Sequence, residues 1–143
     1  MSDAKNRIAN RALAAKVMAV EDAVKFIPDR AKVAVSGFTK SGEPKVFLPA
    51  LADYFARTSP KSRISLFSGA SLSDKTEGPL APFIQKRAPY MSSPVSRKLI
   101  QSGEMDFSDV HLSAFSRNFM YGFYGDIDFA VVQVSSIRVD GRV

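Results

Sequence analysis

A loop with two glycines, residues 36–45, contains the residue types that point most directly to chemistry. It follows a short apolar run and precedes a helix-like stretch, and open α/β sheets bind ligands at this carboxyl end of a strand. Gly37 and Gly42 let the backbone turn and approach a ligand, and the N–H groups that begin a helix favour an anion. The glycine spacing is that of the first part of a P-loop, but Glu43 and Pro44 replace its lysine and magnesium-binding hydroxyl. An NTPase is therefore excluded, and an anion-binding loop or an ordinary glycine-containing turn remains.

Two further segments contain residues that suit a ligand. Segment 67–73 follows a second apolar run and consists mostly of small residues, which leave room for a ligand or for a close-packed loop. Segment 86–94 combines basic, aromatic and hydroxyl residues with two prolines that stiffen it, so it can hold a carboxylate or a phosphate. A turn after a strand also explains the first segment, and a rigid surface loop also explains the second.

The single histidine and the late aromatic residues give weaker signals. His111 lies between apolar neighbours, which favours a structural role over a catalytic one. The aromatic residues are interpreted as core or interface; they are Phe115, Phe119, Tyr121, Phe123 and Tyr124. No two carboxylates have a spacing that supports an acid–base pair. The chain has no cysteine, which excludes thiolate zinc sites, disulfides and cysteine nucleophiles.

The composition predicts one globular domain. The chain has 143 residues, of which 45% are hydrophobic, and this is enough for one core but not for two average domains. The net charge of +6 favours a polyanionic partner. The basic residues are scattered, however, and no nucleic-acid-binding signature accompanies them, so we expect no nucleic acid partner. A domain that handles a polyanionic cofactor is the alternative to a merely solvated basic surface.

The sequence predicts neither a membrane span nor a secretory signal. No apolar run approaches the length of a span, and residues 1–20 lack a continuous apolar core. These residues are basic and mildly amphipathic, which leaves a mitochondrial transit peptide as an alternative. The acidic Asp3 counts against that alternative.

Helices and strands alternate along the chain. Helical spacing of apolar residues predicts helices at 5–27, 44–57, 79–86 and 94–102. Apolar runs predict strands at 32–35, 63–67 and 126–135, and 137–143 is interpreted as the start of another strand. This alternation predicts an α/β fold with a mostly parallel open sheet and flanking helices. Because 137–143 looks interrupted midway, we expect the domain to be incomplete.

Several short blocks, taken in order, form a pattern that is more specific than any one of them. The first are Ser-Gly-Phe-Thr-x-x-Gly-x-Pro-Lys at 36–45 and Gly-Ala-Ser at 69–71. Arg-Ala-Pro-Tyr at 87–90, Arg-Lys-Leu-Ile at 97–100 and His-Leu-Ser at 111–113 follow. The last are Tyr-Gly-Phe at 121–123, Asp-Phe-Ala-Val-Val at 128–132 and Ile-Arg-Val-Asp-Gly at 137–141. The pattern resembles the acetyl-CoA hydrolase/transferase family, of the class I CoA-transferase type. The resemblance covers the chain and implies a CoA-transferase-like N-terminal domain at 1–143.

This resemblance implies an activity for the family's full-length members. They are several times longer, with two similar α/β halves, and move coenzyme A between carboxylic acids or hydrolyse short acyl-CoA thioesters. A glutamate in the second half attacks the thioester and passes through a glutamyl-CoA intermediate. We therefore expect no catalytic residue in this chain, no turnover by the chain alone and no metal. Glu43 does not match the position of the catalytic glutamate.

The resemblance also implies which residues form the wall of a pocket for acyl-CoA and a short carboxylate of the acetate, propionate or succinate class. Ser71 and Ser92 are expected to direct hydroxyls toward the carboxylate. Arg87 is expected to be an anion partner or a loop anchor. The other expected wall residues are Gly37, Phe38, Thr39, Gly42, Gly69 and Ala70.

Some residues depart from the family's usual pattern. Lys40, Ser41 and Glu43 replace smaller or aromatic residues in the first loop, and Leu72-Ser73 replaces a Thr-Gly pair. These positions lie near the expected substrate, so the acyl group and the choice between hydrolysis and transfer stay open. The resemblance further implies a cytoplasmic homodimer, with mitochondria as the alternative compartment. The alternative functions are a non-catalytic scaffold or regulatory domain and, with less support, a basic nucleic-acid-binding domain.

Overall fold

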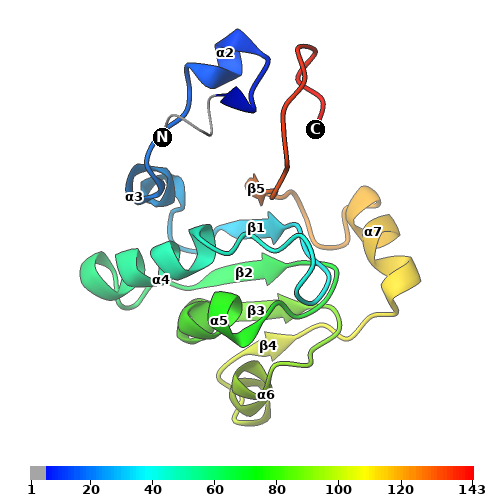
Figure 1. Ribbon diagram of the computed structural model, residues 1–143. Helices are drawn as coiled ribbons and strands as arrows, with labels where there is room; N and C mark the ends of the chain where they lie inside the picture. Colours follow the sequence, from blue (N-terminus) through cyan, green and yellow to red (C-terminus); the bar gives the residue numbers. More distant parts are fainter. Residues whose placement is uncertain (1–5) are drawn as a thin grey trace.

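Parallel strands form one open sheet in the order β4-β3-β2-β1-β5 (Figure 1). The computed structural model describes residues 6–143. The strands are β1 Lys32–Val35, β2 Ile64–Phe67, β3 Ile84–Ala88, β4 Asp106–Phe107 and β5 Phe129–Val131. The predicted α/β fold with a parallel open sheet is therefore confirmed.

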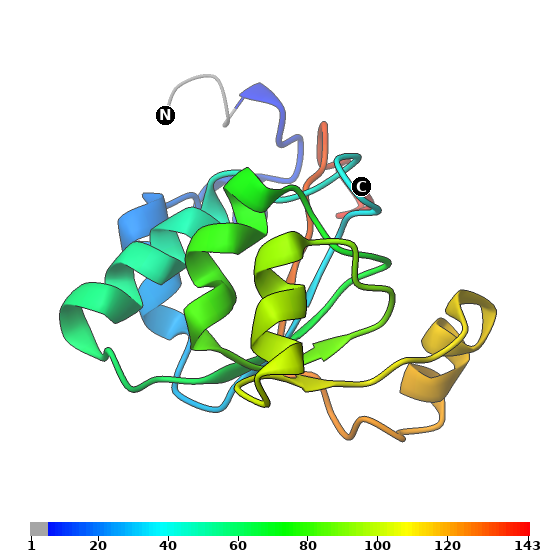
Figure 2. The same cartoon turned by 90° about the horizontal axis from the view of Figure 1, so that it is seen from below.

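Helices pack over one face of this sheet, where Figure 2 shows α4, α5 and α6 side by side. The α-helices are α2 Arg11–Ala14, α3 Val20–Ala23, α4 Phe47–Thr58, α5 Asp74–Glu77, α6 Pro94–Gln101 and α7 Leu112–Met120. The 3-10 helices are η1 Val24–Phe26 and η2 Gly78–Phe83. The sheet encloses the main core together with α3, η1, α4, η2 and α6, and this core includes Val33 of β1 and Leu66 of β2.

The longest helix, α4, illustrates how the sequence builds this core. Its buried residues are Leu48, Leu51, Ala52 and Phe55, a stripe at helical spacing that faces the sheet. The helix begins at Phe47 rather than at the predicted Pro44. Pro49 lies in its first turn, where a backbone N–H has no intrahelical acceptor, so the proline costs the helix little.

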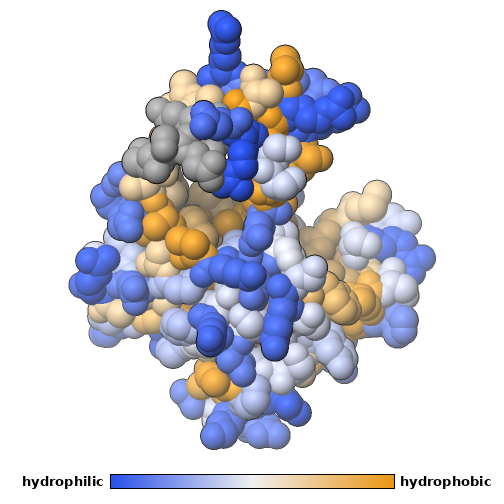
Figure 3. Space-filling model, in the orientation of Figure 1, coloured by the Kyte–Doolittle hydropathy of each residue, from blue (hydrophilic) through white to orange (hydrophobic). Residues whose placement is uncertain are grey.

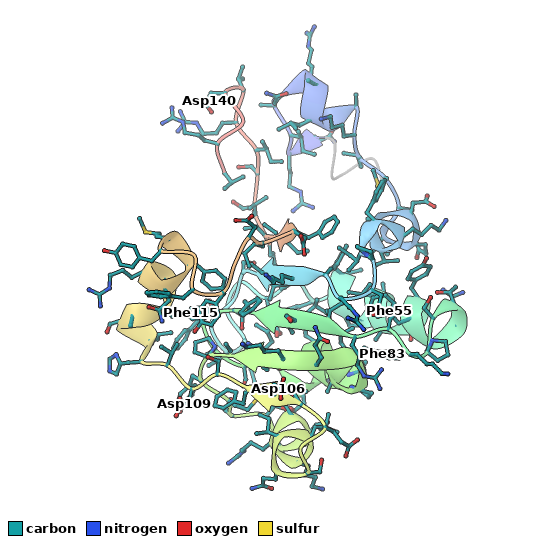
Figure 4. All side chains as sticks on the ribbon, turned by 180° about the vertical axis from the view of Figure 1, so that it is seen from behind. Phe55, Phe83, Asp106, Asp109, Phe115 and Asp140 are labelled. Atoms are coloured by element: carbon teal, nitrogen blue, oxygen red, sulfur yellow. The ribbon has the colours of Figure 1, made fainter. Side chains whose placement is uncertain are left out.

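A second, smaller core lies on the other face of the sheet, at its carboxyl end. Phe67 and Ala88 end β2 and β3, and they pack against Phe115 of α7, which Figure 4 labels. Phe119 and Tyr124 pack against this cluster, with their ring centroids 4.9 Å apart. Sequence patterns did not predict α7. They correctly assigned these aromatic residues to a core, whereas the neighbouring Tyr121 and Phe123 are exposed.

The N-terminal region differs from its prediction. The expected helix at 5–27, whose first residue lies outside the described residues, is wrong as one element, because α2, α3 and η1 replace it. Asn10 has extended backbone and its side chain caps α2 by accepting from Leu13 N, and Ala19 is extended before α3. A continuous helix cannot pass through such residues. Backbone bonds instead join this region to the C-terminal segment, as between Ala9 N and Ile137 O (Figure 1).

The predicted helix at 79–86 is also wrong. Its first part is the 3-10 helix η2, and its end belongs to β3, a strand that the sequence did not reveal. Pro82 lies inside this element and removes a backbone donor that an α-helix needs, which limits the helix to this short form. The sequence did not indicate this strand because the polar Gln85 and Lys86 interrupt its apolar run. The strand predicted at 126–135 is present but shorter, as β5. Segment 137–143 is not a strand, and its one ladder contact is an isolated bridge between Ile137 and Ile8.

We expect Gly37→Ala to lower the free energy of unfolding by about 2–4 kcal/mol, because it adds left-handed strain and a clash. Gly37 has φ +128°, and a Cβ there would lie 2.7 Å from Leu72 Cδ2 and 3.2 Å from Glu43 Cα. Urea denaturation measures the change. The matched control is Gly78→Ala, at negative φ with nothing within 4 Å of the added Cβ. Equal effects of the two substitutions would contradict the close approach at Gly37.

Candidate functional site

The loops that follow β1, β2 and β3 meet at the carboxyl edge of the sheet. Gly69 N donates to Gly37 O at 3.2 Å, which joins the first two loops through their backbones. Thr39 forms a parallel bridge to Leu72, and Ser71 N donates to Tyr90 O at 3.0 Å, which joins the second and third loops. The three segments that the sequence singled out separately therefore form one surface.

A small groove of about 160 Å³ lies on this surface. It is lined by Thr39, Lys40, Ser71, Leu72, Ser73, Asp74, Ser92, Ser93 and Pro94. Of the predicted wall residues, Thr39, Ser71 and Ser92 line it. The two serines expected to face a carboxylate are thus brought together, although they lie 21 residues apart in the chain.

Ser71 and Ser92 play different parts in this groove. The Ser71 side chain is fully buried, and its Oγ accepts from Ser92 N at 2.7 Å and lies 3.3 Å from Tyr90 O. Its hydroxyl therefore ties the second loop to the third. Ser92 is exposed, and within residues 6–143 no hydrogen bond engages its hydroxyl. Ser92 is the hydroxyl that is available to a ligand.

The first loop makes a tight turn at the rim of the groove. Phe38 and Ser41 exchange two backbone hydrogen bonds, of 3.0 and 3.2 Å, around Thr39, which adopts φ +59°. A β-branched residue rarely takes this conformation, so the turn stores local strain. Phe38 is half exposed, and Gly42 closes the turn at φ +68° by accepting from Ser36 Oγ. Phe38 and Gly42 shape the rim but do not line the groove.

Arg87 lies beneath the loops and does not line the groove. Its side chain has no exposed surface, and it donates to both carboxylate oxygens of Glu77, at 2.9 and 3.0 Å. It also donates to Ser68 Oγ and to the carbonyl oxygen of the buried Ala70. The guanidinium is therefore placed as a loop anchor, with no face open to an anion.

Sequence reasoning missed Glu77, the partner of Arg87. Glu77 is fully buried, and it also accepts from Leu72 N at 3.0 Å and from Ser96 Oγ at 3.4 Å. One carboxylate thus joins the loop after β2, the strand β3 and helix α6. The pairing depends on how the short α5 folds over β3, and no spacing in the sequence indicates it.

Glu43 is likewise a structural carboxylate. It is 3% exposed, and its two oxygens accept from Ser73 N at 2.8 Å and from Ser73 Oγ at 2.9 Å. These bonds fasten the first loop to the second. His111 lies outside the groove and caps α7, where its Nδ1 accepts from Ser113 N at 3.3 Å.

Among residues 6–143, no group of three or more histidine, cysteine or acidic side chains is placed to hold a metal ion. No helix in the same range is long and apolar enough to cross a membrane.

The groove lies at the carboxyl edge of the parallel sheet of an open α/β domain, which is where folds of this class usually bind ligands. The whole chain, residues 1–143, matches the model of the acetyl-CoA hydrolase/transferase N-terminal domain. The chain therefore belongs to this family, as its motifs predicted.

Curated relatives use CoA thioesters. The chain is 38% identical over 131 residues to the propanoyl-CoA:succinate CoA transferase of Escherichia coli strain K12, a match to 88% of this chain and 27% of that enzyme. It is 31% identical over 147 residues to an acetyl-CoA hydrolase of Neurospora crassa, covering 96% of this chain and 28% of that protein. The chain spans about a quarter of the length of these relatives.

A solved structure supports the fold assignment. An acyl-CoA transferase from E. coli O157:H7, determined as a thioester complex with CoA, matches with a TM-score of 0.61 and 22% identity. The match covers 73% of this chain and 22% of that one. The predicted CoA-transferase-like fold is confirmed.

We expect Arg87→Met to lower the free energy of unfolding by about 3–5 kcal/mol, because it leaves the Glu77 carboxylate buried and unpaired. Glu77→Leu should lower the free energy of unfolding by a similar amount, because it leaves the Arg87 guanidinium buried and unpaired. Urea denaturation of both single variants and of the double variant gives the coupling energy. The double variant should lose clearly less stability than the sum of the two single variants. Additive losses would contradict a buried pair as the anchor of the loops.

Proposed function

We propose that this chain forms the N-terminal part of a CoA-transferase or acyl-CoA hydrolase that acts on short acyl groups. Its role is to supply one wall of the pocket that holds the acyl group and the carboxylate substrate. The attacking glutamate, which forms the glutamyl-CoA intermediate, lies outside this chain. Acetate, propionate and succinate are the substrate class.

The observation that carries this proposal is the serine-lined groove at the strand ends. Its hydroxyl at Ser92 is free of hydrogen bonds within residues 6–143, while Ser71 holds the backbone that presents it. A carboxylate accepts hydrogen bonds well from hydroxyl donors. The groove volume of about 160 Å³ suits a short acid.

The carboxylates of the loops support a nucleophile from elsewhere. Both oxygens of Glu43 are held by Ser73, and both oxygens of Glu77 are held by Arg87. A carboxylate that attacks a thioester needs a free oxygen aimed at the carbonyl carbon. Neither glutamate offers one.

For the full-length protein we propose a homodimer in the cytoplasm, on the strength of the family resemblance. A non-catalytic scaffold is the second candidate, and it is favoured only by the structural hydrogen bonds that hold both glutamates of these loops. Analytical ultracentrifugation and cell fractionation of the full-length protein test the assembly and the compartment. A monomer, or recovery with mitochondria, would contradict them.

We expect no release of CoA when the purified 143-residue chain is given acetyl-CoA, propionyl-CoA or succinyl-CoA with acetate or succinate as acceptor. The reason is that its pocket wall lacks the attacking carboxylate. Circular dichroism confirms that the tested chain is folded, and Glu43→Gln is the matched variant. Turnover that Glu43→Gln abolishes would make Glu43 the nucleophile and overturn the proposal.

A chimera provides the positive arm of this test. The chain replaces the matched N-terminal segment of the E. coli propanoyl-CoA:succinate CoA transferase, to which it is 38% identical. The chimera should transfer CoA. A folded chimera without CoA transfer would favour the scaffold.

A further inference from the structure

Beside the serine groove lies a larger hollow of about 670 Å³ that the proposed carboxylate does not need. It is lined by Lys40, Glu43, Lys45, Ser73, Asp74, Lys75 and Thr76. Ligand sites for cofactor-sized molecules fall in this range of volume. The hollow shares Lys40, Ser73 and Asp74 with the groove, so one extended ligand can occupy both.

The three lysines of this hollow have no partner within the described residues. Lys40, Lys45 and Lys75 are all exposed, and within residues 6–143 none of their ammonium groups makes an ion pair or a side-chain hydrogen bond. They come from the loop after β1 and from α5. Figure 3 shows hydrophilic residues gathered over these two elements.

Both carboxylates of the lining make structural contacts, although Asp74 is exposed and its second oxygen makes no hydrogen bond within residues 6–143. Glu43 is buried and bonded through both oxygens to Ser73, and Asp74 Oδ1 accepts from Ser93 Oγ at 2.8 Å. They lower the net charge of the hollow without neutralising it. The ammonium groups are the charges that remain free to bind an incoming anion.

Coenzyme A has the chemistry that fits both spaces. Its diphosphate and ribose phosphate are multiply charged anions, and its other end carries the acyl thioester. Lysine is a common point-charge partner for phosphate. A ligand whose acyl end lies in the groove and whose phosphates lie in the hollow uses every feature of this surface.

We propose that Lys40, Lys45 and Lys75 form the subsite for the phosphate groups of the acyl-CoA substrate. This assignment rests on the proposed function, since it takes the serine groove as the acyl end. It also gives a role to Lys40, one of the residues by which this first loop departs from the family's pattern. The lysine side chains bind the nucleotide end and do not take part in the chemistry.

Isothermal titration calorimetry of the folded 143-residue chain tests the subsite. The probes are coenzyme A, pantetheine, which lacks the phosphates, and inorganic pyrophosphate. Coenzyme A and pyrophosphate should bind, pantetheine should bind more weakly than coenzyme A, and the affinity for coenzyme A should fall as salt is added. Lys40→Gln, Lys45→Gln and Lys75→Gln should each weaken coenzyme A about three- to tenfold, since each removes one ion pair with a phosphate. The matched control is Lys61→Gln, an exposed lysine before β2 that lines a different depression, and it should leave the affinity unchanged.

The remaining outcomes separate the subsite from the proposed function. Coenzyme A binding that is equally tight in all lysine variants would overturn the subsite and leave the proposed function standing, as would pantetheine that binds as tightly as coenzyme A. If pyrophosphate bound in a lysine-dependent manner and coenzyme A did not bind, the hollow would be a site for a different phosphate compound. This result would contradict both the subsite and the proposed function. Failure of all three probes to bind would overturn the subsite.

Discussion

The buried pair between Arg87 and Glu77 is the contact on which the candidate site depends. Neither side chain has exposed surface, and each ion needs the other because a lone buried charge is strongly unfavourable. Arg87 extends the contact to Ser68 and Ala70, and Glu77 extends it to the backbone of Leu72. The loop after β2 is therefore held from below along its length. These buried contacts support the groove above it, and a wall that is preorganised in this way lowers the entropy cost of binding.

The polar groups of the surface above this pair are of two kinds, buried and exposed. Buried groups such as Ser71 and Glu43 form hydrogen bonds that join one loop to the next. The exposed Ser92 hydroxyl and Lys75 ammonium group make no hydrogen bond within residues 6–143 and are available to a ligand. The unbonded Ser92 hydroxyl lies in the groove, Lys45 and Lys75 line the hollow, and Lys40 lines both. This polarity matches a molecule with a small acyl end and a phosphate end.

The sequence predicted the parts of this arrangement that depend on local pattern. The strands at 32–35 and 63–67 and the helix α6 follow from apolar runs and from a proline at a helix start, and the ordered blocks identified the family. The strand β3 was not predicted because its middle residues are polar. Its burial comes from its neighbours in the fold and not from an apolar pattern of its own. The Arg87–Glu77 pair was also not predicted, because it depends on how α5 folds over the sheet. The helix predicted at 5–27 failed because Asn10 and Ala19 take extended backbone, which apolar spacing does not register.

The measurement that tests the central claim most directly is an amide NMR titration of the isotope-labelled chain with acetyl-CoA. The claim is that the loops after β1, β2 and β3 form one ligand-binding wall. It predicts that the largest shift changes fall on residues 39–40, 71–75 and 92–93, which line the groove and the hollow. Changes centred instead on residues 59–62, at the opposite end of β2, or on 134–139 would contradict the claim. So would a folded chain whose spectrum does not change.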